Sequence, residues 1–313
     1  MSAKEEKTVK RLLLISGVSG SGKTTIIKEL TKRNEKYVLV KSVTTRIKRD
    51  NDDFYYHVNR DEFETFSGGY LEKVCYCGNW YGTPVTEVEK IWRESNNIPV
   101  LDVDINGFIQ IRSWAMNNDV QVSSIFIISP ATEIFNRLRN RGTESIQDII
   151  IRMIRAVKEV KMLEYVPYGV IIENQSFDQA IKEILDYALK NEHDKLCEKE
   201  KILIKGFIKE MENIISECYR GLDSEVQTDT NFALEKASFA LVCDPLLREA
   251  GNLIIKTGKT SLGFIQHSFK IGFFRALFIL QQLEDIGLLS PNIEEREILL
   301  TVEKFEKICD GLL

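Results

Sequence analysis

The chain has 313 residues, of which 43% are hydrophobic and 28% are charged, a length and composition typical of two domains with real cores. Its net charge of -5 and its pI near 5.5 exclude a global attraction to nucleic acid or anionic membranes, so such binding would need a local patch. No stretch approaches the roughly 18 apolar residues of a membrane span or forms a signal-peptide core. We therefore expect a cytoplasmic protein whose six scattered cysteines are reduced thiols.

A glycine-rich segment follows the first apolar run. Residues 12–15 (LLLI) predict a buried strand, and residues 25–30 predict the first turns of a helix. Between them, residues 17–24 (GVSGSGKT) fit the phosphate-binding pattern G-x-x-x-x-G-K-[ST], which presents backbone N–H groups and a helix N-terminus to phosphate. Lys23 would reach the outer phosphates of ATP, and Thr24 would bind Mg²⁺. The other residues that we assign to ATP here are Ser19, Gly20, Ser21, Gly22 and Thr25.

A polar, cationic segment follows the next predicted strand, residues 37–40. In residues 41–49 (KSVTTRIKR), Arg46 and Arg49 stand three apart beside hydroxyl side chains. This arrangement suits a phosphate monoester, because a guanidinium group binds phosphate oxygens through two parallel hydrogen bonds. A solvated basic loop is the alternative.

Acidic residues come with the next two predicted strands. Residues 70–77 alternate as a half-buried strand does, and Glu72 lies in this run. Residues 100–104 (VLDVD) predict a buried strand that delivers Asp102 and Asp104 at its end. Parallel strands bring acids to a Mg²⁺ and nucleotide site in this way.

Arginines follow a further buried strand, predicted at residues 124–130. A helix with Arg137 and Arg141 comes next, and then a helix with Arg152. If this segment folds over the phosphates as a lid, the arginines would offset negative charge on the transferring phosphoryl group. An exposed pair of salt-bridged helices is the alternative. Residues 170–172 predict the last strand.

Taken in this order, the motifs resemble those of guanylate kinase, the family that transfers a phosphoryl group from ATP to GMP. The resemblance covers residues from about 10 to 190 and implies an α/β fold, a P-loop parallel sheet with flanking helices. It implies Mg²⁺ held at Thr24 and Asp102, and Asn174 near the adenine of ATP. The catalytic residues that it implies are Lys23, Arg46, Arg49, Arg137, Arg141 and Arg152. The GMP-binding residues that it implies are Ser42, Arg46, Arg49, Tyr55 and Tyr81 for the phosphate, and Glu72, Thr83 and Asp104 for the guanine.

The implied guanine site has a chemical basis. A carboxylate accepts hydrogen bonds from guanine N1–H and the 2-amino group, a donor face that adenine lacks, and the Thr83 hydroxyl suits the O6 side. Two segments depart from the family pattern: residues 50–54 and the loop before Glu72 are shorter than is usual. Both border the acceptor pocket, so dGMP or another small phosphate monoester is the alternative substrate.

The composition changes at about residue 191. Residues 195–219 carry apolar residues spaced three, four, three and four apart, namely Ile204, Phe207, Met211, Ile214 and Cys218. This helical seam predicts packing against a neighbouring domain, with an autonomous dimer as the alternative. Residues 221–231 predict a loop or hinge. We expect three units: a kinase-like domain at 1–190, a helical linker at 191–243 and a small domain at 244–313.

The last unit resembles the winged-helix gamma domain of the bacterial DNA translocase FtsK. Helix-like stretches at 246–257, 261–270 and 271–287 are followed by an apolar run at 298–300. The amino-acid sequence is similar to that of the gamma domain in three short segments, namely DP at 244–245, FKIG at 269–272 and QLEDIG at 282–287. The recognition helix of such a domain enters the major groove of DNA. The resemblance implies DNA-binding candidates, namely Lys259, His267, Lys270 and Arg275.

Charge and side-chain chemistry weaken the DNA hypothesis. Residues 244–313 contain eight basic and ten acidic residues, so phosphate attraction is weak. Two base-reading positions carry Phe274 and Phe278, which cannot make a bidentate base contact. Protein binding or a structural role is the alternative. For the whole chain we expect an ATP:GMP phosphotransferase. The alternative is a nucleotide-sensing DNA- or protein-binding regulator with little kinase turnover.

Overall fold

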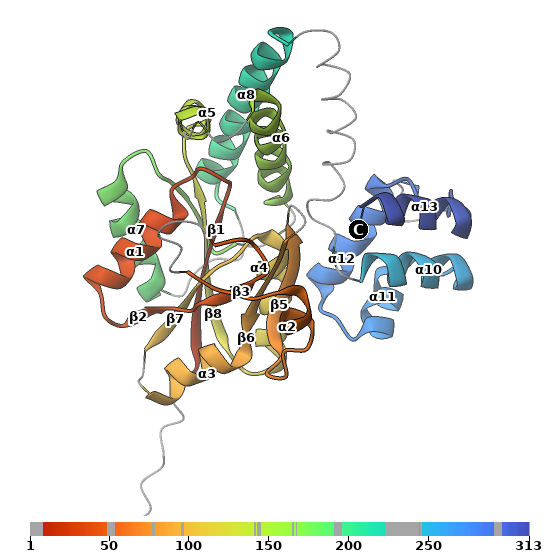
Figure 1. Ribbon diagram of the computed structural model, residues 1–313, viewed down its shortest axis with the longest axis horizontal. Coiled ribbons are helices and arrows are strands. Elements are labelled where there is room, and N and C mark those ends of the chain that lie inside the picture. The colour runs from red at the N-terminus through yellow and green to blue at the C-terminus, as the bar shows by residue number, and fades with distance from the viewer. Residues whose placement is uncertain are drawn as a thin grey trace, which may run out of the picture.

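The computed structural model describes residues 9–48, 54–76, 79–94, 97–140, 142, 145–164, 166, 168–190, 196–222, 244, 246–290 and 296–312. Strands and helices mix in the N-terminal part, a long helix follows, and the C-terminal part is helical (Figure 1). The predicted α/β class is confirmed.

The central sheet is parallel throughout. Within the described residues its order is β2-β7-β1-β8-β9, with bounds β1 (Arg11–Gly17), β2 (Tyr37–Leu39), β7 (Ile98–Asp102), β8 (Gln121–Ile128) and β9 (Val170–Glu173). The middle of β1 is buried on both faces, as its apolar run predicts. Ile15 pairs in register with Asp102, so the carboxyl ends of β1 and β7 deliver the phosphate loop and the acids to one edge of the sheet.

Helices cover both faces of this sheet. On one face, α1 (Lys23–Arg33) and α7 (Phe177–Lys190) share an apolar cluster with β1 and β8. The other face carries a larger cluster, which includes residues of the helices α3 (Val85–Glu94), α4 (Ile105–Asn117), α5 (Ala131–Asn140) and α6 (Ile146–Met162). The doubly covered sheet explains why its strands read as almost continuous apolar runs.

A second sheet holds five of the expected GMP-binding residues, namely Ser42, Tyr55, Glu72, Tyr81 and Thr83. Its order in the described part is β4-β3-β6-β5, with bounds β3 (Ser42–Thr44), β4 (Tyr55–His57), β5 (Tyr70–Tyr76) and β6 (Asn79–Pro84). The short helix α2 (Arg60–Glu64) lies between β4 and β5 and begins with a capping box at Asn59. The strand predicted at residues 70–77 forms β5 at Tyr70–Tyr76, and residue 77 lies outside the described residues.

The predicted helical seam forms α8 (Glu198–Arg220), which packs along α6. Ile204, Phe207 and Met211 are buried in the same cluster as the sheet and α6. Glu200 anchors the start of α8, because its Oε1 accepts a hydrogen bond of 2.7 Å from the backbone N of Ile171 in β9. Packing against the neighbouring domain is therefore confirmed. Of the predicted loop at 221–231, only the first two residues are described.

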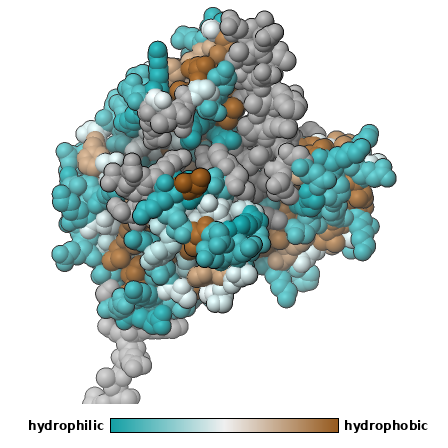
Figure 2. All heavy atoms as spheres, viewed as in Figure 1, coloured by the Kyte–Doolittle hydropathy of each residue, from teal (hydrophilic) through white to brown (hydrophobic). Residues whose placement is uncertain are grey.

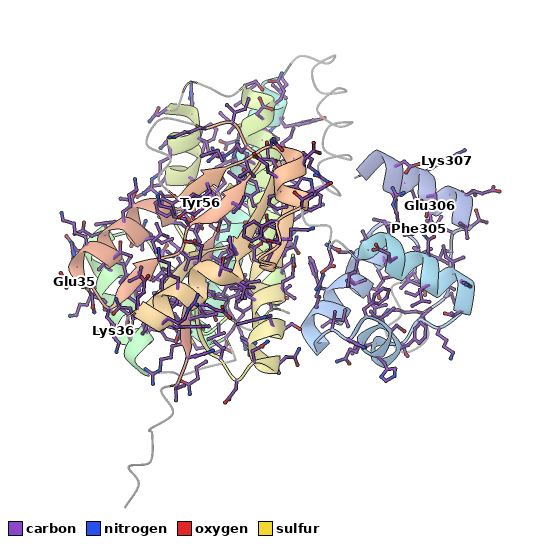
Figure 3. All side chains as sticks on the ribbon, turned by 60° about the horizontal axis from the view of Figure 1, so that its bottom comes forward. Glu35, Lys36, Tyr56, Phe305, Glu306 and Lys307 are labelled. Carbon is purple, nitrogen blue, oxygen red and sulfur yellow. The ribbon has the colours of Figure 1, made fainter. Side chains whose placement is uncertain are left out.

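The C-terminal part has the element order of a winged helix. The helices α10 (Leu247–Thr257), α11 (Leu262–Phe269) and α12 (Phe273–Asp285) precede an antiparallel bridge between Leu289 and Ile298. The helix α13 (Val302–Leu312) follows and was not predicted from the sequence. Its Phe305 is labelled in Figure 3 and packs where α13 meets α10, so close that a Cβ on Gly251 would lie 2.1 Å from the ring.

Among the residues coloured in Figure 2, hydrophilic ones predominate and the hydrophobic ones are scattered between them. Within the described ranges, no helix has both the length and the apolarity needed to cross a bilayer.

Candidate active site

The predicted phosphate-binding loop connects β1 to α1. Gly20 and Gly22 both have a φ of 86°, in the region that favours glycine. A Cβ on Gly22 would also lie 2.8 Å from Nδ2 of Asn174. Lys23 Nζ donates to the backbone oxygens of Gly17 at 2.5 Å and Val18 at 3.2 Å. These hydrogen bonds fix its ammonium group against the first residues of the loop. The adjacent Thr24 and Thr25 are exposed at the first turn of α1.

Arg137 of α5 lies directly on this loop. Its Nη1 donates to the backbone oxygen of Gly20 at 3.0 Å and to Ser129 Oγ at 3.0 Å. Its Nη2 pairs with Glu133, one helical turn earlier. The guanidinium group is thus oriented by three partners beside the position where phosphates would bind.

Two more predicted residues reach the loop from other elements. Arg152 Nη1 of α6 donates to Ser19 Oγ at 3.3 Å. Asn174 follows β9 and is buried, and its Nδ2 donates to the backbone oxygen of Ser21 at 2.9 Å. The structure therefore brings Arg137, Arg152 and Asn174 together around the phosphate loop. Arg141 lies outside the described residues.

A second polar cluster joins the two sheets. Ser42 Oγ lies 3.0 Å from Thr83 Oγ1, and Thr83 Oγ1 donates to Glu72 Oε1 at 2.7 Å. Asp104 caps α4 by accepting from the backbone N of Gly107 at 2.7 Å. A Cβ on Gly107 would lie 3.3 Å from Glu72 Oε2, so the two carboxyl groups approach each other across the first turn of α4.

Burial changes the titration of both carboxyl groups. It raises the pKa of Glu72 to about 8, and the negative charge of Asp104 adds to this, while the hydrogen bond from Thr83 opposes it. Desolvation raises the pKa of Asp104 to about 6, against the hydrogen bonds from the backbone of α4. A ligand that donates hydrogen bonds to these oxygens would replace lost hydration, so the cluster is suited to a group with adjacent N–H donors.

Other residues predicted to bind the acceptor lie on strands next to this cluster. The rings of Tyr55 and Tyr81 lie 5.7 Å apart at their centroids, and the Arg46 guanidinium lies 5.4 Å from the Tyr55 ring. His57 Nδ1 lies 2.7 Å from the backbone oxygen of Arg46 and fixes the chain there. The structure thus places Arg46, Tyr55 and Tyr81 together. Arg49 lies outside the described residues.

Glu159 of α6 was not identified from the sequence. Desolvation raises its pKa to about 7, the positive charges of Lys23 and Arg155 oppose that shift, and the negative charge of Asp104 adds to it. Glu159 therefore interacts electrostatically with both the phosphate-loop lysine and the carboxyl cluster. A signal was present: Glu159 follows Arg152 by seven residues, two helical turns, so both lie on one face of α6.

The oxygens of Thr24 and Asp102 suit Mg²⁺, a hard cation that prefers oxygen ligands. Burial raises the pKa of Asp102, and the positive charge of Lys23 opposes this shift, so a further cation at the same place would stabilise the carboxylate. Within the described residues, no group of three His, Cys, Asp or Glu side chains forms a metal cage. Mg²⁺ is commonly held by one or two protein oxygens together with substrate phosphates, and the residues present fit that arrangement.

Comparison with known proteins gives matches to both parts of the chain. The family model for guanylate kinase matches residues 9–191, and that for the FtsK gamma domain matches residues 242–301. The guanylate kinase of Prochlorococcus marinus is 36% identical over 186 residues, which cover 57% of this chain and 97% of that protein. The guanylate kinase of Mesoplasma florum is 31% identical over 216 residues, 67% of this chain and 70% of that protein.

Among solved structures, a guanylate kinase from Anaplasma phagocytophilum aligns at 27% identity with a TM-score of 0.44, over 60% of this chain and 89% of that one. The family assignment follows from the sequence matches, which extend over more than half of the chain and nearly the whole of the Prochlorococcus enzyme. This chain is therefore a kinase that belongs to the guanylate kinase family, and it carries an FtsK gamma domain after the kinase region.

Proposed function

We propose that the N-terminal region, residues 1–190, transfers the γ-phosphoryl group of ATP to GMP and forms ADP and GDP. The observation that carries this proposal is the buried hydrogen-bonded chain from Ser42 through Thr83 to Glu72, which faces Asp104. Guanine presents N1–H and a 2-amino group side by side, and carboxylate oxygens accept from both. Adenine lacks this pair of donors, so the cluster favours GMP over AMP.

The charges around the loop suit phosphoryl transfer. Lys23, Arg137 and Arg152 surround the expected position of the ATP phosphates and would stabilise negative charge that develops on the transferring group. Arg46 and Arg49, with Tyr55 and Tyr81, would hold the phosphate of the acceptor. Catalysis of this kind depends on positioning and electrostatics, so we propose no side-chain nucleophile.

Thr24 and Asp102 would hold Mg²⁺ between them and the nucleotide. When bound, the ion neutralises charge on the β- and γ-phosphate oxygens. Asp102 is positioned for this task by β7, whose register with β1 places it opposite Ile15, just before the loop.

A panel of monophosphates tests the proposal. The purified full chain would be assayed for ADP formation with ATP, Mg²⁺ and each of GMP, dGMP, AMP, CMP and UMP. We expect GMP to give the highest kcat/KM, ahead of AMP by about 10⁴-fold, because a site built to receive donors rejects an analogue that lacks them. Binding of ATP and GMP without ADP formation would instead favour a nucleotide sensor, and a preference for AMP would contradict the guanine site.

The raised pKa of Glu72 predicts that use of GMP depends on pH. If the carboxylate form accepts from guanine, kcat/KM for GMP should rise about eightfold from about pH 7 to 8.5, because the ionised fraction rises through a pKa of about 8. The KM for ATP should stay level over this range. Initial rates at subsaturating GMP check the prediction, and a flat profile for GMP would show that Glu72 is already ionised or not involved.

For the C-terminal domain, residues 244–313, the match to FtsK gamma makes DNA a candidate partner. Lys259, His267 and Lys270 are exposed on or beside α11. Arg275 is different: its Nε and Nη2 donate to both carboxylate oxygens of Asp244 at 2.8 and 2.9 Å. The pair has exposed side-chain fractions of 17% and 2%, so Arg275 is engaged within its own domain. We infer that any DNA contact would depend on the other three residues.

A further inference from the structure

The helix α12 packs against α4 of the kinase region (Figure 1). The backbone N of Gly272, which caps α12, donates to Ser113 Oγ at 3.1 Å. A Cβ on Gly272 would lie 3.0 Å from the same oxygen, a distance closer than ordinary contact. The N-terminus of α12 is thus seated directly on the α4 surface, in an approach that leaves little room for a side chain.

Phe278 supplies an apolar part of this contact. It is only 8% exposed and belongs to the hydrophobic cluster that contains Phe108 and Ile111 of α4. The C-terminal helices form a separate cluster, to which α12 contributes other residues such as Ile279 and Leu283. The helix is therefore buried on two sides, one within its own domain and one against the kinase region.

The face of α12 that contacts α4 includes Phe278, at a position that the family resemblance assigns to base reading. The first turns of a recognition helix enter the major groove, so a duplex read by this face would have to take the place of α4. Phe278 stands at an expected base-reading position, but it is apolar and buried. Arg275, the polar residue of this helix turn, is held by Asp244. These contacts favour a protein surface over DNA as the partner of this face.

The same helix α4 extends from the docking contact to the guanine cluster. Its N-cap is Asp104, and Gly107 in its first turn lies against Glu72. In its middle, the Gln110 side chain exchanges hydrogen bonds of 3.1 and 3.2 Å with the backbone of Lys73, next to Glu72. Ser113 lies nine residues after Asp104, or about 13 Å along the axis at 1.5 Å per residue. A single rigid element thus connects the two places.

We propose that this face of α12 is an intramolecular docking surface whose partner is α4, and that the docked C-terminal domain positions α4 for binding of GMP. The positioning role rests on the proposed GMP site, whereas the docking contact does not. A duplex that used this face of α12 would compete with α4 for it.

Ser113→Arg in the full chain tests this proposal, because it places a long charged side chain in the contact without altering the C-terminal domain. Met116→Arg is the matched control: it adds the same charge to α4 at a residue that is 72% exposed. Amide hydrogen exchange of α4 and α12 would be compared with the KM values for GMP and ATP. Ser113→Arg should speed exchange in both helices and raise the KM for GMP by about 2- to 30-fold, the range of coupling through packed elements. The KM for ATP should not change.

A second variant approaches the contact from the other side. Phe278→Asp should reproduce the effects of Ser113→Arg, and Met116→Arg should behave as the unmodified chain does. Unchanged exchange in both contact variants would overturn the docking surface. Faster exchange with an unchanged KM for GMP would overturn the positioning role. Lack of turnover of GMP by the unmodified chain would overturn the kinase proposal and the positioning role, while exchange would still decide the docking contact.

DNA binding provides an independent arm of the same experiment. A fluorescent duplex of about 20 base pairs, long enough for a winged-helix site, would be titrated with each variant at fixed salt. Equal, measurable affinity for the unmodified chain and Ser113→Arg, with a loss of affinity in Phe278→Asp, would show that DNA binds this face of α12 without displacing α4, and would overturn the proposal. Tighter binding by Ser113→Arg than by Met116→Arg, no binding by either, or equal binding that Phe278→Asp leaves unchanged agrees with it.

Discussion

Replacement of Lys23 by alanine should lower kcat by about 10³-fold or more, because it removes a preorganised positive charge from the phosphate site. In the structure this ammonium group bridges the backbone oxygens of Gly17 and Val18. It also lowers the pKa values of Asp102, Asp104 and Glu159, each of which burial has raised. Its loss would therefore favour protonation of three carboxyl groups at once, including the proposed Mg²⁺ ligand.

Steady-state assays of ADP formation with ATP and GMP would measure this effect. Lys28→Ala is a matched control, because Lys28 is exposed on the same helix α1 and would leave the loop unchanged. Calorimetric titration with ATP separates a loss of binding from a loss of chemistry. A Lys23→Ala variant that keeps kcat within tenfold of the control would show that the loop does not act as proposed.

The phosphate loop could be predicted from sequence because its signal is local. The strand, the glycines and the helix start occupy one continuous segment, and β1 and α1 form where the apolar pattern places them. The acidic strand β7 was predictable for the same reason. The hydrophobic pattern alone could not predict that Glu72 lies near Asp104, because β5 and α4 belong to different parts of the fold and meet only through tertiary packing. That pairing was expected from the family resemblance.

Other features gave weak signals or none. The strands β3 and β4 have three residues each, too few for a hydrophobic period to show. The missed helix α13 did carry a pattern, with Phe305, Ile308 and Cys309 spaced three and one apart, as on one helical face. The contact of Phe278 with α4 joins residues far apart in the chain. From the sequence, the apolar residue at this base-reading position argued only against a contact with bases and did not identify α4 as its partner.

At about pH 8.5, where Glu72 is mostly ionised, its replacement by glutamine should lower kcat/KM for GMP by about 10²- to 10⁴-fold. Hydrogen bonds to a charged group contribute about 1.5 to 3 kcal/mol each, and two would be lost. The variant keeps an oxygen that accepts from Thr83. It also introduces an amide N–H₂ that would face the N–H donors of guanine. The KM for ATP should not change, because Glu72 lies in the acceptor cluster rather than at the phosphate loop. Glu89→Gln on the exposed side of α3 is the control.

The same substitution should stabilise the folded chain, and this opposite sign makes the test specific. Folding raises the pKa of Glu72 from 4.5 to about 8, so the folded state binds the proton more tightly than the unfolded state does. Ionisation of the buried carboxyl group therefore does not lower the free energy of unfolding below about pH 4.5. As the pH rises towards about 8, it lowers that free energy by an amount that reaches about 2 to 4 kcal/mol.

Thermal unfolding of Glu72→Gln should accordingly show a gain in stability over the unmodified chain at about pH 8, and little gain near pH 5. A misfolded variant would lose activity and stability together. If the carboxylate is retained at a cost in stability because it binds the acceptor base, its replacement should lower activity and raise stability. If Glu72→Gln were less stable at both pH values, the buried carboxyl group would be a structural hydrogen-bonding residue and the guanine assignment would have to move to Asp104.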